Sequence, residues 1–240
     1  MGLVTTEELD VLLGPGAEWE ALGRVREGAQ LYLLGRDISG KWLFVTSPVG
    51  KGWVLRRHVR LKVSLGTLPL VATPSLPPCP RSVDQRLSDL WERARLGCPI
   101  DSADVLWAAW QPFENGYMLW RSDVRQILVF YADGTWANFP DRWQEGMPIP
   151  SRGNPPPGRV APVRGFGLVW GSHEEVAKRL GWALEEEKGF CATVQSFQRG
   201  FIFRSNRVRY CLDELYNWAT HPSFKPLFFA VYGDGGWQRK

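Results

Sequence analysis

The sequence predicts a mostly β protein with a small barrel at residues 1–63, a proline-rich linker at 64–82 and a domain of two β-meander repeats at 83–240, each repeat preceded by a short helix. Three observations predict this fold class. Short alternating apolar runs separated by glycine turns occupy the first part, as in small barrels. Prolines then interrupt the pattern. One meander pattern afterwards occurs twice in the same order, which indicates an internal duplication.

The first domain is small, so its core must be thin. Its alternating runs fall at 23–25, 30–34, 41–45 and 52–55, and its turn signals at 14–16, 27–28, 39–40 and 49–50. We expect four large apolar residues to supply much of the core: Leu31, Leu33, Trp42 and Trp53.

This domain resembles the bacterial SH3 domain, SH3b, over its whole length. The residues that carry the resemblance are Leu9, Val11, Gly14-Pro15-Gly16, Gly28, Trp42 and the closing Gly52-Trp53-Val54. The chain departs from the family pattern at Leu12 and Leu13, where Arg and a small polar residue are usual. The resemblance implies an SH3-like barrel, a non-catalytic module of exported bacterial proteins that binds cell-wall peptide or glycan or acts as a spacer.

The linker at 64–82 is rich in proline, a residue that lacks the backbone N–H needed by a helix or a central strand. We therefore expect a semi-extended spacer between separate domains. Alternatively, residues 68–71 could form a strand over the surface of the second domain.

The first meander lies at 111–136, with turns at Asn115-Gly116 and Asp133-Gly134. The second copy begins at Gln195, and its offset of 84 positions also relates Leu96-Gly97 to Leu180-Gly181. The closing tryptophans are 101 positions apart, so about seventeen residues are inserted in the second meander, around 208–226. Long insertions are usually loops that carry function, and this one has the pattern of a short helix at 212–219.

A short helix is predicted before each meander. Ser82 or Asp84 can cap the first, which ends at Leu96-Gly97. The second runs from Ser172 to Leu180, with acidic residues near its start. We expect the helix to pack its apolar face against the meander that follows it. The inward positions are Leu87, Leu90, Trp91 and Ala94 in the first helix, and Val176, Ala177 and Leu180 in the second.

The repeats, at 83–150 and 168–240, are similar to LGFP repeats. The residues that carry this similarity are Leu96-Gly97-Cys98-Pro99 with Phe113 and Gly116, and Leu180-Gly181-Trp182-Ala183 with Phe197 and Gly200. The second copy lacks the proline and has Arg204 where the first has Trp120. The resemblance implies attachment to, or organisation of, the bacterial cell envelope. In the proline-rich connector between the repeats, Trp143 is expected to fold back on the first meander.

Composition argues against several classes of protein. The net charge is +4, and the basic residues form short separate clusters at 56–60 and 204–209, unlike the continuous stripe that a nucleic acid requires. No apolar run is long enough to span a membrane. The start of the chain has no signal-peptide pattern, which also fits a chain from which an export signal has been removed.

The cysteines Cys79, Cys98, Cys191 and Cys211 can form two disulfides in three pairings. We favour a bond between Cys79 and Cys98, which flank the first helix, with a stabilisation of about 3 kcal/mol. The alternative is four buried free thiols in a reducing compartment. No CxxC pair supports a structural zinc site.

The sequence predicts no enzymatic activity, cofactor or metal. His58, His173 and His221 are far apart, and Cys211 near His221 lacks a flanking nucleophile signature. The acidic run at 185–187 is typical of a solvated face. The common nucleotide-binding, zinc-protease and serine-hydrolase motifs are absent.

Aromatic residues are the candidate binding residues, because 13 tryptophans are more than small cores readily use. Flat aromatic faces bind sugars and extended peptides at low entropy cost. Alternation places Trp120 with Met118 on one face and Tyr117 with Leu119 on the other, and we expect one face to be exposed. The candidates are Trp19, Tyr32 and Trp42 in the first domain, with Trp53 beneath them, and Trp107, Trp110, Tyr117 and Trp120 in the repeats.

The resulting prediction is a non-enzymatic, extracellular or cell-surface binding module for cell-envelope material, either peptidoglycan peptide or glycan, or for another surface protein. One alternative is a structural subunit of a larger surface assembly, which would purify as a discrete oligomer. Another is the targeting part of a cell-wall hydrolase, which would turn over muropeptide.

Overall fold

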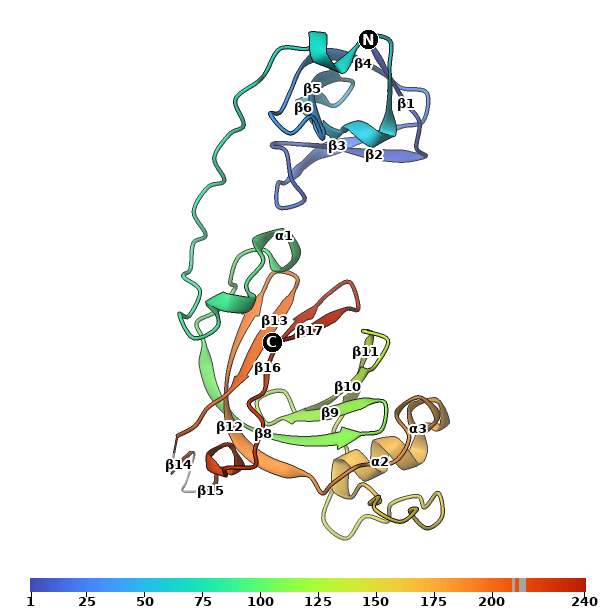
Figure 1. Ribbon diagram of the computed structural model, residues 1–240, viewed down its shortest axis with the longest axis vertical. Helices are drawn as coiled ribbons and strands as arrows, with labels where there is room; N and C mark the ends of the chain where they lie inside the picture. The colour runs from blue at the N-terminus through green and yellow to red at the C-terminus, as the bar shows by residue number, and fades with distance from the viewer. Residues whose placement is uncertain (209, 212–214) are drawn as a thin grey trace. The chain divides into compact units, whose positions relative to one another are not determined.

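The computed structural model describes residues 1–208, 210–211 and 215–240, and it describes side chains for residues 1–208 and 217–240. The protein is mostly β and has two compact units (Figure 1). One unit comprises Met1–Cys79 with Arg93–Arg95, and the other comprises Pro80–Glu92 with Leu96–Lys240. Within the described residues, every helix is too short or too polar to cross a bilayer.

The first unit is a small antiparallel sheet in the order β3-β2-β6-β5-β4-β1-β7. Its strands are β1 (Gly2–Val4), β2 (Glu8–Leu12), β3 (Ala21–Arg26), β4 (Gln30–Arg36), β5 (Trp42–Ser47), β6 (Gly50–Leu55) and β7 (Val59–Leu61), and η1 (Arg56–His58) precedes the last. The predicted alternating runs correspond to β3, β4, β5 and β6. Of the expected core residues, Leu31 and Trp53 are buried. Leu33 and Trp42 are only half-buried.

The predicted linker begins too early in the sequence. Leu68 is buried in the core of the first unit, next to the 3-10 turn η2 (Leu65–Thr67). Arg36 N–H donates to the Pro69 carbonyl, and Val71 N–H donates to the Arg36 carbonyl, both at 2.9 Å. Residues 68–71 therefore lie beside β4 of the first unit and not over the second domain, because the thin core of a small unit gains from extra apolar cover.

Among the described residues, the second unit contains an eight-stranded antiparallel sheet in the order β11-β10-β9-β8-β12-β13-β16-β17. The first meander is β8 (Asp104–Phe113), β9 (Gly116–Arg121), β10 (Gln126–Tyr131) and β11 (Trp136–Pro140); the second is β12 (Lys188–Phe197), β13 (Gly200–Ser205), β16 (Phe228–Tyr232) and β17 (Trp237–Arg239). The duplication predicted from the sequence is therefore visible as two four-stranded halves. Strands β8 and β12 join the halves at the centre of the sheet.

The insertion in the second meander contains a two-stranded ribbon and a 3-10 turn. Its elements are β14 (Tyr210–Cys211), β15 (Leu215–Tyr216) and η4 (Trp218–Thr220). The predicted helix at 212–219 lies partly outside the described residues. Its described part forms a strand and a turn instead of an α-helix.

The tips of the two meanders are joined by two equivalent hydrogen bonds, each from a tryptophan indole N–H of one repeat to a tyrosine backbone carbonyl of the other. Trp136 Nε1 donates to the Tyr232 carbonyl at 3.0 Å, and Trp237 Nε1 donates to the Tyr131 carbonyl at 3.2 Å. The sheet is curled so that β11 and β17 approach each other (Figure 1). The two repeats are therefore related by a pseudo-two-fold axis.

The segment before each meander packs on the meander of the other repeat, which corrects the prediction. Asn115 N–H donates to the Leu180 carbonyl at 2.9 Å, and Arg199 N–H donates to the Leu96 carbonyl at 3.0 Å. The reason is the antiparallel pairing of β8 with β12. In this pairing the start of each central strand lies beside the hairpin that ends the other, so the segment entering one strand meets the opposite hairpin.

The first predicted helix is broken, whereas the second is present and extended. In place of the first predicted helix the structure has two short elements, η3 (Ser88–Leu90) and α1 (Arg93–Leu96). A helix as short as the predicted one is only marginally stable by itself, and its leucines are buried without a continuous helix. In the second repeat α2 (Arg164–Ser172) precedes α3 (Glu174–Leu180), and these helices cover the outer face of the first meander.

The curled sheet encloses the other face of the first meander. Met118 and Leu119, neighbours on opposite faces, are both fully buried. The expectation that one face is exposed is therefore wrong.

Candidate functional site

A cavity of about 530 Å³ lies on the outer face of the first meander. Four tryptophans from four separate segments line it: Trp107 on β8, Trp120 on β9, Trp143 after β11, and Trp218 on η4 of the insertion. Cavities of this size with aromatic walls are typical sites for small ligands.

Small residues in the sheet make room for the cavity. Ala109 lies opposite Trp120 on one side and opposite Gly189 on the other. A side chain at Gly189 would overlap the indole of Trp107. The floor of the cavity is therefore backbone and methyl groups, with large aromatic rings standing around it.

The insertion is held against the cavity by one buried amide. Asn217 is fully buried, and its Oδ1 accepts hydrogen bonds from Cys191 N–H at 3.2 Å and from Ala219 N–H at 3.0 Å. Its Nδ2 donates to the Asn206 carbonyl at 2.9 Å. This amide places Trp218 beside β12, where it closes one side of the cavity.

Two polar atoms of the cavity wall are buried and have no hydrogen-bond partner among the described residues: Trp120 Nε1 and Trp143 Nε1. Leaving a buried donor unsatisfied costs about 1–3 kcal/mol. Such donors are expected where a ligand supplies the acceptor.

One ion pair lies at the rim of the cavity. Arg164 Nη1 is 2.5 Å from Glu187 Oε1, and the carboxylate is the more buried partner, with 16% of its side chain exposed against 63% for Arg164. Burial raises the pKa of Glu187 above its ordinary value, and the hydrogen bond from Arg164 offsets part of that rise. Arg164 also has a positive φ of 50°, a conformation that non-glycine residues rarely adopt and that clusters at functional sites.

The structure brings two of the four predicted repeat residues into this cavity. Trp107 and Trp120 point to the outer face, whereas Trp110 and Tyr117 point to the inner face and line a second cavity. Trp143 folds back on the first meander, as predicted. Glu187 belongs to the cavity, which corrects the interpretation of the acidic run as wholly solvated. Trp218 lies in the insertion at 208–226, which the sequence predicted to carry function without indicating a particular residue, whereas no sequence signal predicted Arg164.

The first-unit candidates do not form one compact site. Tyr32, with 61% of its surface exposed, lies opposite Thr46, and Trp42 lies opposite Leu55. Four strand positions separate the two rings, or about 13 Å. Trp19 lies against Gly14 in a separate loop.

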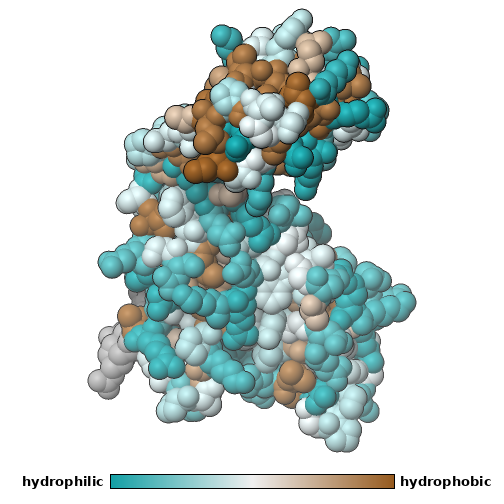
Figure 2. All heavy atoms as spheres, turned by 45° about the horizontal axis from the view of Figure 1, so that its top comes forward, coloured by the Kyte–Doolittle hydropathy of each residue, from teal (hydrophilic) through white to brown (hydrophobic). Residues whose placement is uncertain are grey.

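The first unit instead exposes many apolar side chains (Figure 2). They include Leu13, Leu22, Tyr32, Leu34, Ile38 and Val49. Apolar surface of this kind is a common feature of protein interaction sites.

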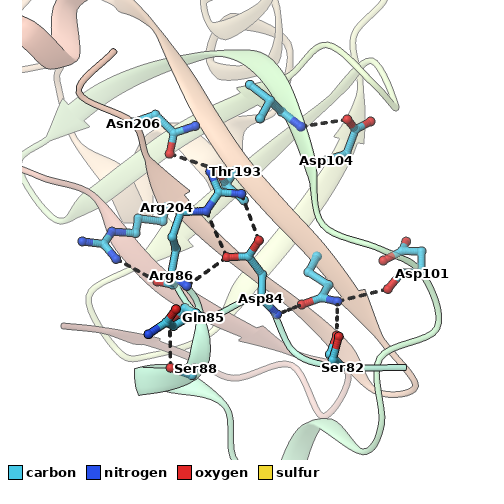
Figure 3. Close-up of polar contacts among 12 residues, drawn as sticks. Ser82, Asp84, Gln85, Arg86, Ser88, Asp101, Asp104, Thr193, Arg204 and Asn206 are labelled. Atoms are coloured by element: carbon cyan, nitrogen blue, oxygen red, sulfur yellow. Dashed lines mark hydrogen bonds and ion pairs between the residues drawn. The ribbon is translucent and has the colours of Figure 1, made fainter. Parts of the chain in front are cut away.

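The equivalent sheet positions of the second repeat are occupied by a polar network (Figure 3). Thr193 lies opposite Arg204, where the first repeat has Ala109 opposite Trp120. Arg204 Nη1 donates to the Arg86 carbonyl at 2.8 Å. Arg86 in turn forms an ion pair with Asp84 at 2.9 Å. The tryptophan cavity is thus a feature of one repeat and not a consequence of the fold.

The three cysteines whose side chains the structure describes are oxidised. Cys79 and Cys98 form a disulfide, as predicted, and Cys191 is also disulfide-bonded. The side chain of Cys211 lies outside the described residues. None of the described cysteines is free, so the alternative of four free thiols is wrong. The described part of the chain contains no cluster of His, Cys, Asp and Glu that could hold a metal ion.

Comparison of the chain with protein-family models, curated proteins and solved structures finds no match. The resemblances to SH3b domains and LGFP repeats therefore stay predictions, and function has to be argued from the cavities themselves.

Proposed function

We propose that this protein is a non-enzymatic binding protein of the cell envelope, and that the tryptophan cavity holds one sugar ring of an envelope glycan. The observation that carries the proposal is the pair of buried indole N–H groups, Trp120 Nε1 and Trp143 Nε1, without a partner among the described residues. Hydroxyl or acyl oxygens of a bound sugar would accept these hydrogen bonds.

A sugar suits the remaining chemistry of the cavity. Its C–H faces stack on aromatic rings, and its hydroxyls both donate and accept hydrogen bonds. The wall supplies indole faces and indole donors, while Asp141 and Glu187 supply acceptors. Because indole N–H donors require an acceptor, they favour a hydroxylated ligand over a bare organic cation.

The cysteine chemistry supports a location outside the cytoplasm. Disulfides persist in oxidising compartments and are rare in reducing ones, and the described cysteines are all oxidised. A cell-surface location agrees with the expectation from the sequence.

A second role, assembly with another surface protein, is favoured by the exposed apolar side chains of the first unit, such as Tyr32 and Ile38. In this role the first unit would contact a protein while the second unit holds glycan. A discrete oligomer or co-complex in which Ile38 becomes protected from solvent would support it.

The test is calorimetric titration of the whole protein with soluble oligomers of N-acetylglucosamine, followed by retention on purified sacculi. Trp120→Phe keeps an aromatic ring but removes the indole N–H together with the pyrrole ring, so we expect it to weaken binding about tenfold. The matched control is Trp136→Phe, because that indole N–H bonds the Tyr232 carbonyl away from the cavity.

The control should bind like the wild type. If the wild type does not bind the oligomers, or both variants lose affinity equally, the glycan proposal is wrong. Retention on sacculi from which glycan has been digested would point to the peptide instead. Trp42→Ala tests the first unit separately, since its loss should lower retention only if that unit also binds wall material.

A further inference from the structure

A second cavity of about 810 Å³ lies in the same unit, on the inner face of the curled sheet. Three aromatic rings form one wall. Trp110 and Tyr117 are stacked with centroids 4.5 Å apart, and Trp237 meets Tyr117 edge-on at 6.1 Å. The cavity opens on the face of the sheet opposite to the tryptophan cavity, so the two are separate sites.

The lining carries positive charge that its own acids do not neutralise. Of the lining carboxylates, Glu114 pairs with Arg159 at 2.7 Å and Glu185 pairs with Lys188 at 2.5 Å. Arg239 and Lys225 also line the cavity. Among the described residues, neither of these two cations forms an ion pair with a carboxylate. The electrostatic potential in the cavity should therefore be positive.

Arg239 is positioned at the aromatic wall with weak partners. Its guanidinium carbon lies 5.4 Å from the centroid of Tyr117 and 6.0 Å from that of Trp110. Its hydrogen bonds, to Tyr117 Oη at 3.3 Å and to the Pro226 carbonyl at 3.5 Å, are long and go to neutral acceptors. A guanidinium held in this way can still form a bidentate pair with a carboxylate or phosphate group.

The fold does not require these residues. The equivalent of Arg239 in the first repeat is Asn138, which donates to Gln126 Oε1 at 2.7 Å. The equivalents of Trp110 and Tyr117 are Val194 and Phe201. On the symmetry-related side Arg121 lies over the Phe201 ring at 4.5 Å, but it forms an ion pair with Asp123 at 2.6 Å. Among the described residues, only the side of Arg239 therefore combines a polar aromatic ring with a cation that has no carboxylate partner.

We propose that this second cavity binds an anionic ligand, with a carboxylate or phosphate group on Arg239 and the adjoining part of the ligand on Trp237. Lys225 adds charge at the opening. The site does not depend on glycan binding in the tryptophan cavity, because the two share no wall residue.

The test is titration of the whole protein with trigalacturonate, which carries carboxylates, tripolyphosphate, which carries phosphates, and maltotriose, which is neutral. We expect binding of at least one anion, weakening with salt, and no binding of maltotriose. Arg239→Gln should weaken anion binding about tenfold, with Arg239→Lys between wild type and Gln. The charge-matched control is Lys178→Gln, because the Lys178 side chain lies on the solvent side of α3 and is exposed.

If Arg239→Gln weakens the binding of trigalacturonate more, the preferred group is a carboxylate. If it weakens the binding of tripolyphosphate more, the preferred group is a phosphate. If Lys178→Gln weakens anion binding as much as Arg239→Gln does, the effect comes from the net charge of the protein and the proposal is wrong. The proposal is also wrong if Arg239→Gln binds the anions unchanged or if the wild type binds neither anion. Trp120→Phe should leave anion binding unchanged, so failure of the glycan proposal and failure of this one give different results.

Discussion

Trp107 of β8 lies directly opposite Cys191 of β12, and these two residues occupy equivalent positions in the two repeats. Equivalent residues can face each other in an antiparallel pair only if the two-fold axis passes between them. The repeats differ at this axis, because Trp107 lines the tryptophan cavity whereas Cys191 is disulfide-bonded. Duplication thus built a symmetric sheet, and substitution at its centre made the two halves chemically different.

Two glycines lie where the leading segment of one repeat packs on the hairpin of the other, and both should be sensitive to substitution. Gly116 and Gly200 have φ values of +149° and +139°, and a Cβ at either position would overlap a carbonyl oxygen of the neighbouring strand. Replacing either with Ala should destabilise the second unit by about 3 kcal/mol or more, measured by urea unfolding. Gly134→Ala is the control, because its φ of +83° is strained but the space is open, so it should lose only about 1–2 kcal/mol.

The reciprocal indole bonds should be coupled. Trp136→Phe and Trp237→Phe each remove one hydrogen bond to a carbonyl and some packed ring atoms, and each should cost at least about 1 kcal/mol. Since both bonds close the same junction, the double variant should lose less than the two single losses combined. Strict additivity in urea unfolding would show that the two meander tips act independently.

Losing the unpartnered donor should cost the free protein less than losing a bonded one. Trp120→Phe and Trp136→Phe remove the same ring atoms, but Trp120 Nε1 has no partner among the described residues whereas Trp136 Nε1 bonds a carbonyl, so Trp120→Phe should lose less stability in the unliganded protein. The midpoint of thermal unfolding measures this. A loss as large as that of Trp136→Phe would mean that an acceptor, such as a buried water, already serves the indole.

Glu187 should make stability depend on pH. Its pKa is raised by burial above the ordinary 4.5, so the folded state binds the proton more tightly than the unfolded state. The stability it contributes is full below about pH 4 and is lost as pH rises through the raised pKa. Glu187→Gln should therefore gain stability relative to the wild type as the pH rises above the ordinary carboxyl pKa of 4.5.

The matched control for this pH series is Glu186→Gln, because Glu186 is exposed. The free energy of unfolding of this variant should change with pH in the same way as that of the wild type. Unfolding free energies would be compared across the series. If Glu187→Gln instead loses stability as the pH rises, the ion pair with Arg164 outweighs burial.

Oxidation of the cysteines can be checked by thiol titration. The denatured, unreduced protein should show no reactive thiol at Cys79, Cys98 or Cys191. Replacing Cys79 and Cys98 together with Ser should lower the free energy of unfolding by about 3 kcal/mol. Four reactive thiols would contradict the disulfides and remove the main support for an extracellular location.

Much of the second unit was predictable because its signals are local. The turns at 115–116 and 133–134, the alternation along β9 and β10, and the repeated Leu-Gly pair each depend on neighbouring residues. Alternation also predicted that Trp120 and Tyr117 lie on opposite faces, and the two line different cavities. The predicted first helix, which was to end at Leu96-Gly97, did not form as one helix for the opposite reason, since its leucines satisfy core packing in more than one backbone conformation.

Local patterns in the chain were thus enough to predict a duplicated meander and its turns. Only the folded arrangement showed that each leading segment caps the other repeat, and that Trp143, Trp218 and Arg164 complete a cavity begun by Trp107 and Trp120. The reason is the pairing of β8 with β12 across 84 positions. Alternation specifies which side of a strand is apolar, but the partner strand is chosen by long-range packing, which leaves no local trace.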